Sequence, residues 1–142
     1  HVMLRYEGGA KGMLWSSQVA PGCENGLKLR VYGEKGGLEW SQEDPNYLWF
    51  TPHGEPKRLL TRNGAGAYGV NQDASRIPPG HPEGYLEGFA NIYNEAADVI
   101  TAAREGKTIA HALPTVHDGL DGVTFIDACV RSSASNAAWV KV

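Results

Sequence analysis

Apolar and polar residues alternate with a period of two through most of the first 62 positions. This alternation is typical of β-strands with one buried face. Short stretches rich in Gly, Pro, Asn and Asp interrupt it and predict turns. Such short connections join antiparallel strands, because a parallel pair needs a crossover of a dozen or more residues. The pattern therefore predicts a β-meander with strands at 2–6, 13–20, 27–32, 38–42, 47–51 and 57–61.

The period changes to that of an α-helix in the second half of the chain. Pro82 suits the first position of a helix expected over 82–105, and Glu83 and Glu87 would lie near the positive end of its dipole. Gly106 is a natural C-terminal stop. The apolar stripe that predicts this helix consists of Tyr85, Phe89, Ile92, Tyr93, Ala96, Val99, Ile100 and Ala103.

A second helix is expected to begin near position 118. Asp118 is predicted to be its N-cap, with Asp121 as a shorter version of the capping-box partner. The last residues, 138–142, return to alternation and predict a closing strand that could rejoin the sheet. The apolar positions of the second helix are Leu120, Val123, Ile126, Cys129 and Val130.

The order of the elements predicts the fold class. Strands first and helices later favour an α+β fold, an open and mainly antiparallel sheet with helices packed on one face. We expect the other face to be an oligomer or interdomain interface, because large apolar patches usually meet another protein surface. Alternatively, loops or a further segment cover it. That face would carry part of the set Trp15, Tyr32, Trp40 and Trp49.

Composition narrows the class of protein. The chain has 142 residues, enough for one ordinary domain, and a formal net charge of −3. We therefore expect neither a nucleic-acid nor a membrane partner, since it has no basic field and no apolar run of the ~20 residues that a membrane span needs. Cys23 and Cys129 lack metal-ligand spacing, and Cys129 is expected to be a buried, reduced thiol. A cytoplasmic setting and no metal site follow as expectations.

A glycine-rich segment at 64–69 (GAGAYG) matches the G-x-G-x-x-G fingerprint of dinucleotide-binding folds. That fingerprint requires a buried strand before it and a helix opening behind it. Here the preceding strand is short and polar, and 70–80 shows no helical stripe. We interpret the match as fortuitous and 63–80 as a long functional or mobile loop.

The segment 80–85 (GHPEGY) carries the most informative polar residue. His81 would lie at a helix N-terminus directly after the long loop, where an imidazole can bind a substrate hydroxyl. The alternative is that His81 caps its helix and has no role in substrate binding. His111 and His117 lack a third ligand at metal spacing, and neither a G-x-S-x-G elbow nor a paired set of carboxylates stands out.

Taken together, these residues resemble the C-terminal domain of the Gfo/Idh/MocA oxidoreductases, which include glucose-fructose oxidoreductase and inositol 2-dehydrogenase. The resemblance covers nearly the whole chain, in the segments 18–20, 29–40, 81–85, 114–120 and 132–140. It implies a sheet like the C-terminal domain of glyceraldehyde-3-phosphate dehydrogenase, and oligomer contacts through the open sheet face. The full-length enzyme would transfer hydride between NAD or NADP and a carbinol carbon of a sugar or polyol.

The same resemblance implies which residues meet the substrate. His81 would bind a substrate hydroxyl, and Arg76, Trp15 and Gln18 would line the same cleft. The family's Rossmann domain, its E-K-P segment and its D-x-x-x-H element are not in this sequence. We therefore expect a piece of a longer protein that by itself binds no dinucleotide tightly and is inactive. The alternative is a stand-alone carbohydrate-binding or dimerisation module built on Trp15, Trp40 and Trp49.

Overall fold

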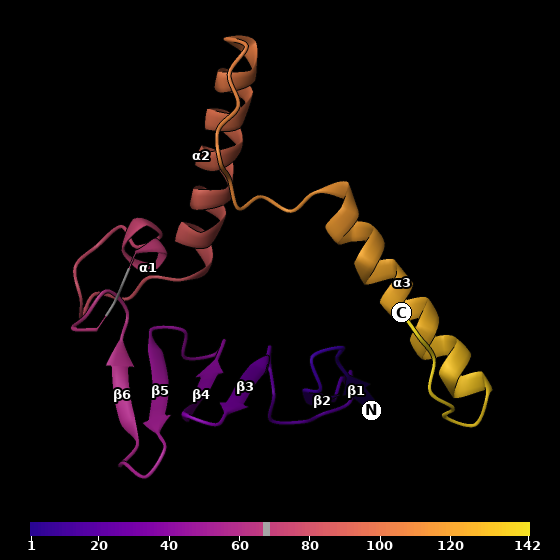
Figure 1. Cartoon of the computed structure of the whole chain (residues 1–142). Coiled ribbons are helices and arrows are strands. Elements are labelled where there is room, and N and C mark those ends of the chain that lie inside the picture. Colours follow the sequence, from indigo (N-terminus) through magenta and orange to yellow (C-terminus); the bar gives the residue numbers. More distant parts are fainter. Residues whose placement is uncertain (67–68) are drawn as a thin grey trace. The chain divides into compact units, whose positions relative to one another are not determined.

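The computed structural model describes residues 1–66 and 69–142, with the side chains at 70 and 71 left aside. They form two compact units, 21–111 and the pair of segments 1–20 and 112–142. Figure 1 shows the helices and strands of each unit. Within the described part of the chain, no helix is long and apolar enough to cross a membrane.

The unit 21–111 contains a four-stranded antiparallel sheet in the order of the sequence, as Figure 1 shows. Its strands are β3 (Lys28–Gly33), β4 (Gly36–Ser41), β5 (Tyr47–Pro52) and β6 (Arg58–Thr61). The predicted meander is thus confirmed for these four strands, because the tight turns between them leave no room for a crossover.

Strand register separates the side chains of this sheet into two faces. Leu38 lies opposite both Val31 and Phe50, and Trp40 lies opposite Leu48. Since directly opposed residues share a face, one face is mostly apolar and holds Leu29, Val31, Leu38, Trp40, Leu48, Phe50 and Leu60. The other is mixed and holds Arg30, Tyr32, Glu39, Tyr47, Trp49 and Leu59.

Helix α2 (Tyr85–Arg104) follows the one-turn helix α1 (Val70–Asp73) in the same unit. The prediction that α2 begins at Pro82 is wrong, because its N-cap is Gly84, whose N–H group donates to the Glu87 carboxylate at 2.9 Å. Glu83 is held outside the helix by its contacts with Arg62, which follows β6, and with Asn46. At the other end the helix stops before Gly106, which adopts φ 69°, as predicted.

The second unit contains a two-stranded antiparallel sheet and the helix α3 (Val116–Ala134). Its strands are β1 (Val2–Arg5) and β2 (Lys11–Leu14), so the strand predicted over 13–20 ends early. The N-cap of α3 is Thr115 and not Asp118. The carboxylate of Asp118 instead accepts the Thr115 N–H at 2.6 Å and its hydroxyl at 2.7 Å, which completes a capping box.

The predicted closing strand is also wrong, since 138–142 forms no strand. Asn136 and Ala137 both adopt positive φ, 55° and 59°, and turn the chain back along α3. The carbonyl oxygen of Ala138 then accepts the Ser132 hydroxyl at 2.8 Å. Two consecutive left-handed residues are uncommon outside glycine, and period-two alternation does not reveal them.

The α+β class with antiparallel strands is confirmed, although the described strands form two sheets. The described part of the chain buries few apolar side chains. Ala102 and Ala128 are its buried hydrophobic residues, and Cys129, expected to be buried, is half-exposed. Most of its large apolar side chains face solvent, a pattern that marks surfaces for further contacts.

Candidate functional site

A buried ion pair joins the end of the sheet to the start of α2. Arg62 directly follows β6, and Glu83 lies two residues before α2. Their Nη1 and Oε2 atoms are 2.5 Å apart, and the side chains are 18% and 4% exposed. Glu83 is the buried charged residue of the described chain. A carboxylate removed from water is tolerated only when it is paired and hydrogen-bonded.

The Arg62 guanidinium also holds the loop that precedes α2. Its Nε–H donates to Asn46 Oδ1 at 3.0 Å. Its Nη groups donate to the carbonyl oxygens of Ile77, Pro78 and His81 at 3.2, 3.4 and 2.7 Å. The guanidinium thus donates four hydrogen bonds, while Glu83 Oε2 faces it in an ion pair and has no hydrogen bond within the described residues. One side chain therefore fastens an irregular segment of backbone.

The Glu83 residue fixes the same loop from its other side. Its Oε1 accepts the main-chain N–H of Arg76 at 2.6 Å, and its own N–H donates to Asn46 Oδ1 at 3.2 Å. The Arg76 side chain is tied to Asn91 Oδ1 at 2.8 Å, and the Asn91 amide donates to Ala74 O at 2.7 Å. The loop is thus bonded to the sheet and to α2.

A hollow of about 450 Å³ lies beside this ion pair. Apolar side chains of the sheet line it together with polar groups of the loop and of α2. Its size is within the range of small-molecule pockets, about 300–1,000 Å³. Its lining includes Trp40, Leu48, Leu60, Arg62, Asn63, Glu83, Glu87 and Asn91. The apolar face of the sheet is therefore the face toward which α2 begins.

Two of the four predicted substrate residues, His81 and Arg76, lie in the loop before α2, but neither of them lines the hollow. His81 is exposed, and its imidazole makes no hydrogen bond to any described residue. The alternative in which His81 caps α2 is wrong, because Gly84 is the N-cap. Arg76 lies in the same loop and is exposed. Trp15 and Gln18 belong to the other unit, where the Trp15 ring stacks on His1 at 6.2 Å.

Sequence reasoning missed the residues that hold the loop. Asn46, Arg62 and Glu83 are far apart along the chain and match no motif. One available signal is the carboxylate in the segment 80–85 (GHPEGY), between a proline and a glycine. Gly84 directly after this carboxylate disfavours a helical first turn, whereas Pro82 suits the first helical position, so the sequence alone does not distinguish a tertiary partner from a dipole contact.

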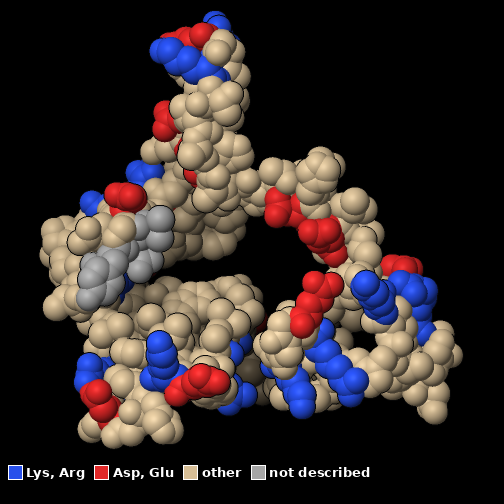
Figure 2. Space-filling view, in the orientation of Figure 1, with Lys and Arg blue, Asp and Glu red and all other residues tan. Residues whose placement is uncertain are grey.

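Charge near the start of α2 is modest. The main-chain N–H of Gly84 donates to Glu87 and holds the pKa of that carboxyl below its usual range. On the face in Figure 2, Lys and Arg side chains lie among Asp and Glu side chains without a broad one-sign region. Arg62, Glu83 and Glu87 are the charged residues in the described lining of the hollow, and Arg62 is paired with Glu83, so the hollow has no cationic field for a polyanion.

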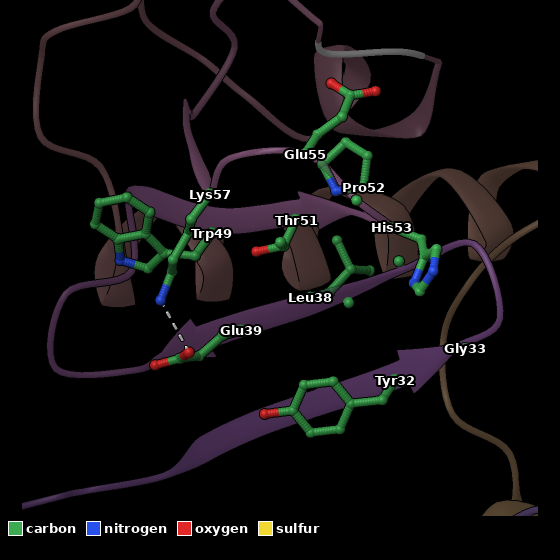
Figure 3. Close-up of a pocket in the computed structure, with 13 residues that line it drawn as sticks. Tyr32, Gly33, Leu38, Glu39, Trp49, Thr51, Pro52, His53, Glu55 and Lys57 are labelled. Carbon is green, nitrogen blue, oxygen red and sulfur yellow. Dashed lines mark hydrogen bonds and ion pairs between the residues drawn. The ribbon is translucent and has the colours of Figure 1, made fainter.

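A second hollow, of about 360 Å³, lies on the mixed face of the sheet. Figure 3 shows Lys57 joined to Glu39, beside the ring of Trp49. The Lys57 Nζ lies 3.1 Å from Glu39 Oε2 and 4.7 Å from the centre of the Trp49 ring. Trp40 lies on the opposite face, so Trp40 and Trp49 cannot form one flat carbohydrate platform.

The glycine-rich segment 64–69 does not lead into a long helix. Ala67 and Tyr68 lie outside the described residues. The helix that follows, α1, has only four residues. A dinucleotide site needs a full helix whose first N–H groups face the pyrophosphate. The described residues of this segment therefore do not fit a nicotinamide dinucleotide.

The chain is similar in sequence to a known protein family and to an oxidoreductase of greater length. Residues 1–142 match the C-terminal alpha/beta domain of an oxidoreductase family. The uncharacterized oxidoreductase YfiI of Bacillus subtilis (strain 168) is 36% identical over 144 residues, which cover 99% of this chain and 37% of that protein. The present chain thus spans less than two fifths of the length of this relative.

Solved structures agree in fold and in sequence. An oxidoreductase from Sinorhizobium meliloti is 65% identical with a TM-score of 0.88, over 97% of this chain and 39% of that one. An inositol dehydrogenase homolog from Azotobacter vinelandii, complexed with NADH and myo-inositol, is 34% identical with a TM-score of 0.89. That match covers 99% of this chain and 38% of the other.

Proposed function

Because this chain belongs to the Gfo/Idh/MocA oxidoreductase family and matches its C-terminal alpha/beta domain throughout, we propose that it is the substrate-side and oligomerisation domain of an NAD(P)-dependent sugar or polyol dehydrogenase. The observation that carries this proposal is its likeness to the inositol dehydrogenase homolog complexed with NADH and myo-inositol. The full-length protein would transfer hydride to or from a carbinol carbon. A cytoplasmic location is part of the proposal.

The substrate wall is proposed to be the exposed loop before α2. His81 presents an imidazole that can donate to or accept from a substrate hydroxyl, and no described residue competes for it. The Arg76 side chain would contribute a further donor from the same loop. Trp15 and Gln18, which belong to the second unit, are proposed as further substrate-binding residues. Uncharged polyols suit this site, because hydroxyl groups need donors and acceptors rather than a charged field.

The nicotinamide cofactor is proposed to bind a companion N-terminal Rossmann domain. In this chain the glycine-rich segment is followed by a single helical turn, which does not fit a dinucleotide. The role of the present residues would then be to bind and orient the substrate. We propose accordingly that the chain alone is inactive and that NAD or NADP preference is set outside it.

A substrate screen on the full-length protein tests this function. Purified enzyme would be incubated with NAD or NADP and a panel of polyols and sugars that includes myo-inositol, and reduction would be followed by nicotinamide absorbance. We expect turnover with at least one member of the panel and none with the isolated chain. Absence of turnover with every member and both cofactors would refute the proposal.

A further inference from the structure

We infer that the buried pair Arg62–Glu83, with Asn46, is a positioning device that sets the main chain at both Arg76 and His81. This inference rests on the proposed function, because it assigns a task to residues that do not face the substrate. The Arg62 guanidinium is bonded to the carbonyl oxygen of His81, and the Glu83 carboxylate to the N–H of Arg76. Both proposed substrate residues are therefore anchored to the same ion pair.

The contacts of this pair go to irregular backbone. Carbonyl groups of an irregular loop have no partner in a helix or a sheet ladder, although the Pro78 carbonyl also accepts the His81 N–H at 3.4 Å. Arg62 supplies a donor to Ile77, Pro78 and His81 from one planar group. An ion pair used only for stability could be replaced by apolar packing at little cost, but apolar side chains could not bind these three carbonyl oxygens.

Asn46 joins the pair to the turn between β4 and β5. Its Oδ1 accepts from both Arg62 Nε and the Glu83 N–H, and its carbonyl oxygen accepts the Arg62 N–H at 2.8 Å. Because Asn46 lies in the turn between β4 and β5, its hydrogen bonds fix the loop before α2 relative to these two strands. The imidazole of His81 remains exposed. Arg62, Glu83 and Asn46 are thus positioning residues that act through His81 and Arg76.

The first test uses R62K and E83Q in the full-length enzyme. Lysine keeps the charge but has three donors and no planar fork, so it cannot reach the same carbonyl set. We expect kcat/KM for the best polyol of the screen to fall about 10- to 100-fold, because small misplacements of a binding group have effects of this size. The matched controls R131K and E105Q alter exposed pairs of the same kind and should change kcat/KM less than about twofold.

The second test separates positioning from general stability. In an H81A background, R62K should cause a smaller further loss than in the wild type, because one of the two side chains through which it acts is already absent. Fully additive losses would overturn the inference, as would an R62K enzyme with wild-type kcat/KM. If R62K does not fold, N46A keeps the ion pair and removes only the shared acceptor. It should lower kcat/KM several-fold in an enzyme that remains folded, together with a melting temperature lowered by a few degrees, because the Arg62 Nε–H and the Glu83 N–H lose their acceptor. Unchanged kinetics would again overturn the inference.

A third measurement does not depend on activity. Amide hydrogen exchange in 76–83 should accelerate in R62K and E83Q, whereas exchange in β3–β5 should not change. Unchanged exchange in this segment would refute positioning even in a protein without polyol turnover. If instead the wild-type enzyme oxidises no polyol but exchange responds as expected, the proposed function fails and the positioning of the loop stands.

Discussion

At the scale of single residues, tertiary partners decide where Glu83 and His81 lie. Glu83 occupies a sequence position that suits the first turn of a helix, yet its carboxylate is buried against Arg62. That contact places the N-cap at Gly84 and leaves His81 before the helix with an exposed imidazole. His81 is the residue that the sequence pattern indicates as a candidate for substrate binding. The position of His81 depends on Glu83, for which the sequence predicted no such role.

His81→Ala in the full-length enzyme tests the role of the imidazole. A lost hydrogen bond to a substrate hydroxyl is worth about 1–3 kcal/mol, so kcat/KM should fall by roughly 5- to 150-fold. The expected melting temperature is that of the wild type, because the imidazole is exposed and unbonded to the described residues. Steady-state kinetics with the best polyol make the measurement, and an unaltered kcat/KM would remove His81 from the site.

Gly36 offers a second residue-scale prediction. It adopts φ 158°, and a Cβ atom there would lie 2.6 Å from the Thr51 carbonyl oxygen in the neighbouring strand. Gly36→Ala should therefore lower the free energy of unfolding by more than about 1 kcal/mol, since the backbone of β5 would have to move. Chemical denaturation checks this, with Gly54→Ala as a control for positive φ (76°) without a steric contact. Equal losses in the two variants would contradict the steric argument.

At the scale of elements, side-chain caps fix where helices begin. Thr115 and Asp118 cap α3 reciprocally, whereas α2 has only the contact from Glu87 to the Gly84 N–H. The main-chain N–H and hydroxyl of Thr115 bind the ionised carboxylate and hold the pKa of Asp118 below its usual range. The start of α3 should therefore respond to acid.

The sign of this response follows from the lowered pKa. The capping contribution of Asp118 is complete above its ordinary pKa and is lost as the pH falls through the lowered value. Thr115→Ala removes the hydroxyl donor and should raise the pKa of Asp118 toward its usual value. It should also destabilise α3 by about 1 kcal/mol. A carbon-detected NMR titration of the Asp118 carboxyl group measures the shift. A pKa that does not respond to T115A would refute the capping box.

At the scale of the whole molecule, the sheet leaves large side chains uncovered on both faces. Tyr32 is 73% exposed on the mixed face, and Leu29 is 59% exposed on the apolar face. The apolar face is the one that forms the hollow with the start of α2. The mixed face carries Tyr32 and Trp49 and remains the proposed oligomer interface. Exposed aromatic side chains such as Tyr32 and Trp49 are enriched where one protein surface meets another.

Self-association through the mixed face can be tested by introducing a charged side chain into that face. Tyr32→Glu places a carboxylate in the proposed interface, where its burial without a partner is unfavourable. We expect the wild-type full-length protein to be a dimer or larger in light scattering, and Tyr32→Glu to shift it toward the monomer. Glu105→Arg, an exposed change at the end of α2, serves as the control. A monomeric wild type at high concentration would refute the proposed interface.

The sequence predicted the sheet and the helices because the periodic patterns of strands and helices extend over only a few neighbouring residues. Alternation at two residues and recurrence at three or four suffice to predict the four-stranded meander and α2 and α3. The errors concern ends and partners. The helix starts at Gly84 and Thr115 were misplaced, and the turn at Asn136 and Ala137 replaced an expected strand. Each of these depends on a specific hydrogen bond or backbone angle rather than on a period.

The sequence by itself determined the α+β class, the antiparallel order of the meander, the family and the segment that holds His81. Only the tertiary structure decided what holds that segment in place. Asn46 and Glu83 are bonded across 37 positions of the chain, and Arg62 and His81 across 19. No periodic pattern reaches over such separations. Folding buries the Glu83 carboxylate, and a buried charge is stable only when it is paired. Its partners are supplied by residues that are distant in the sequence and close in the folded chain.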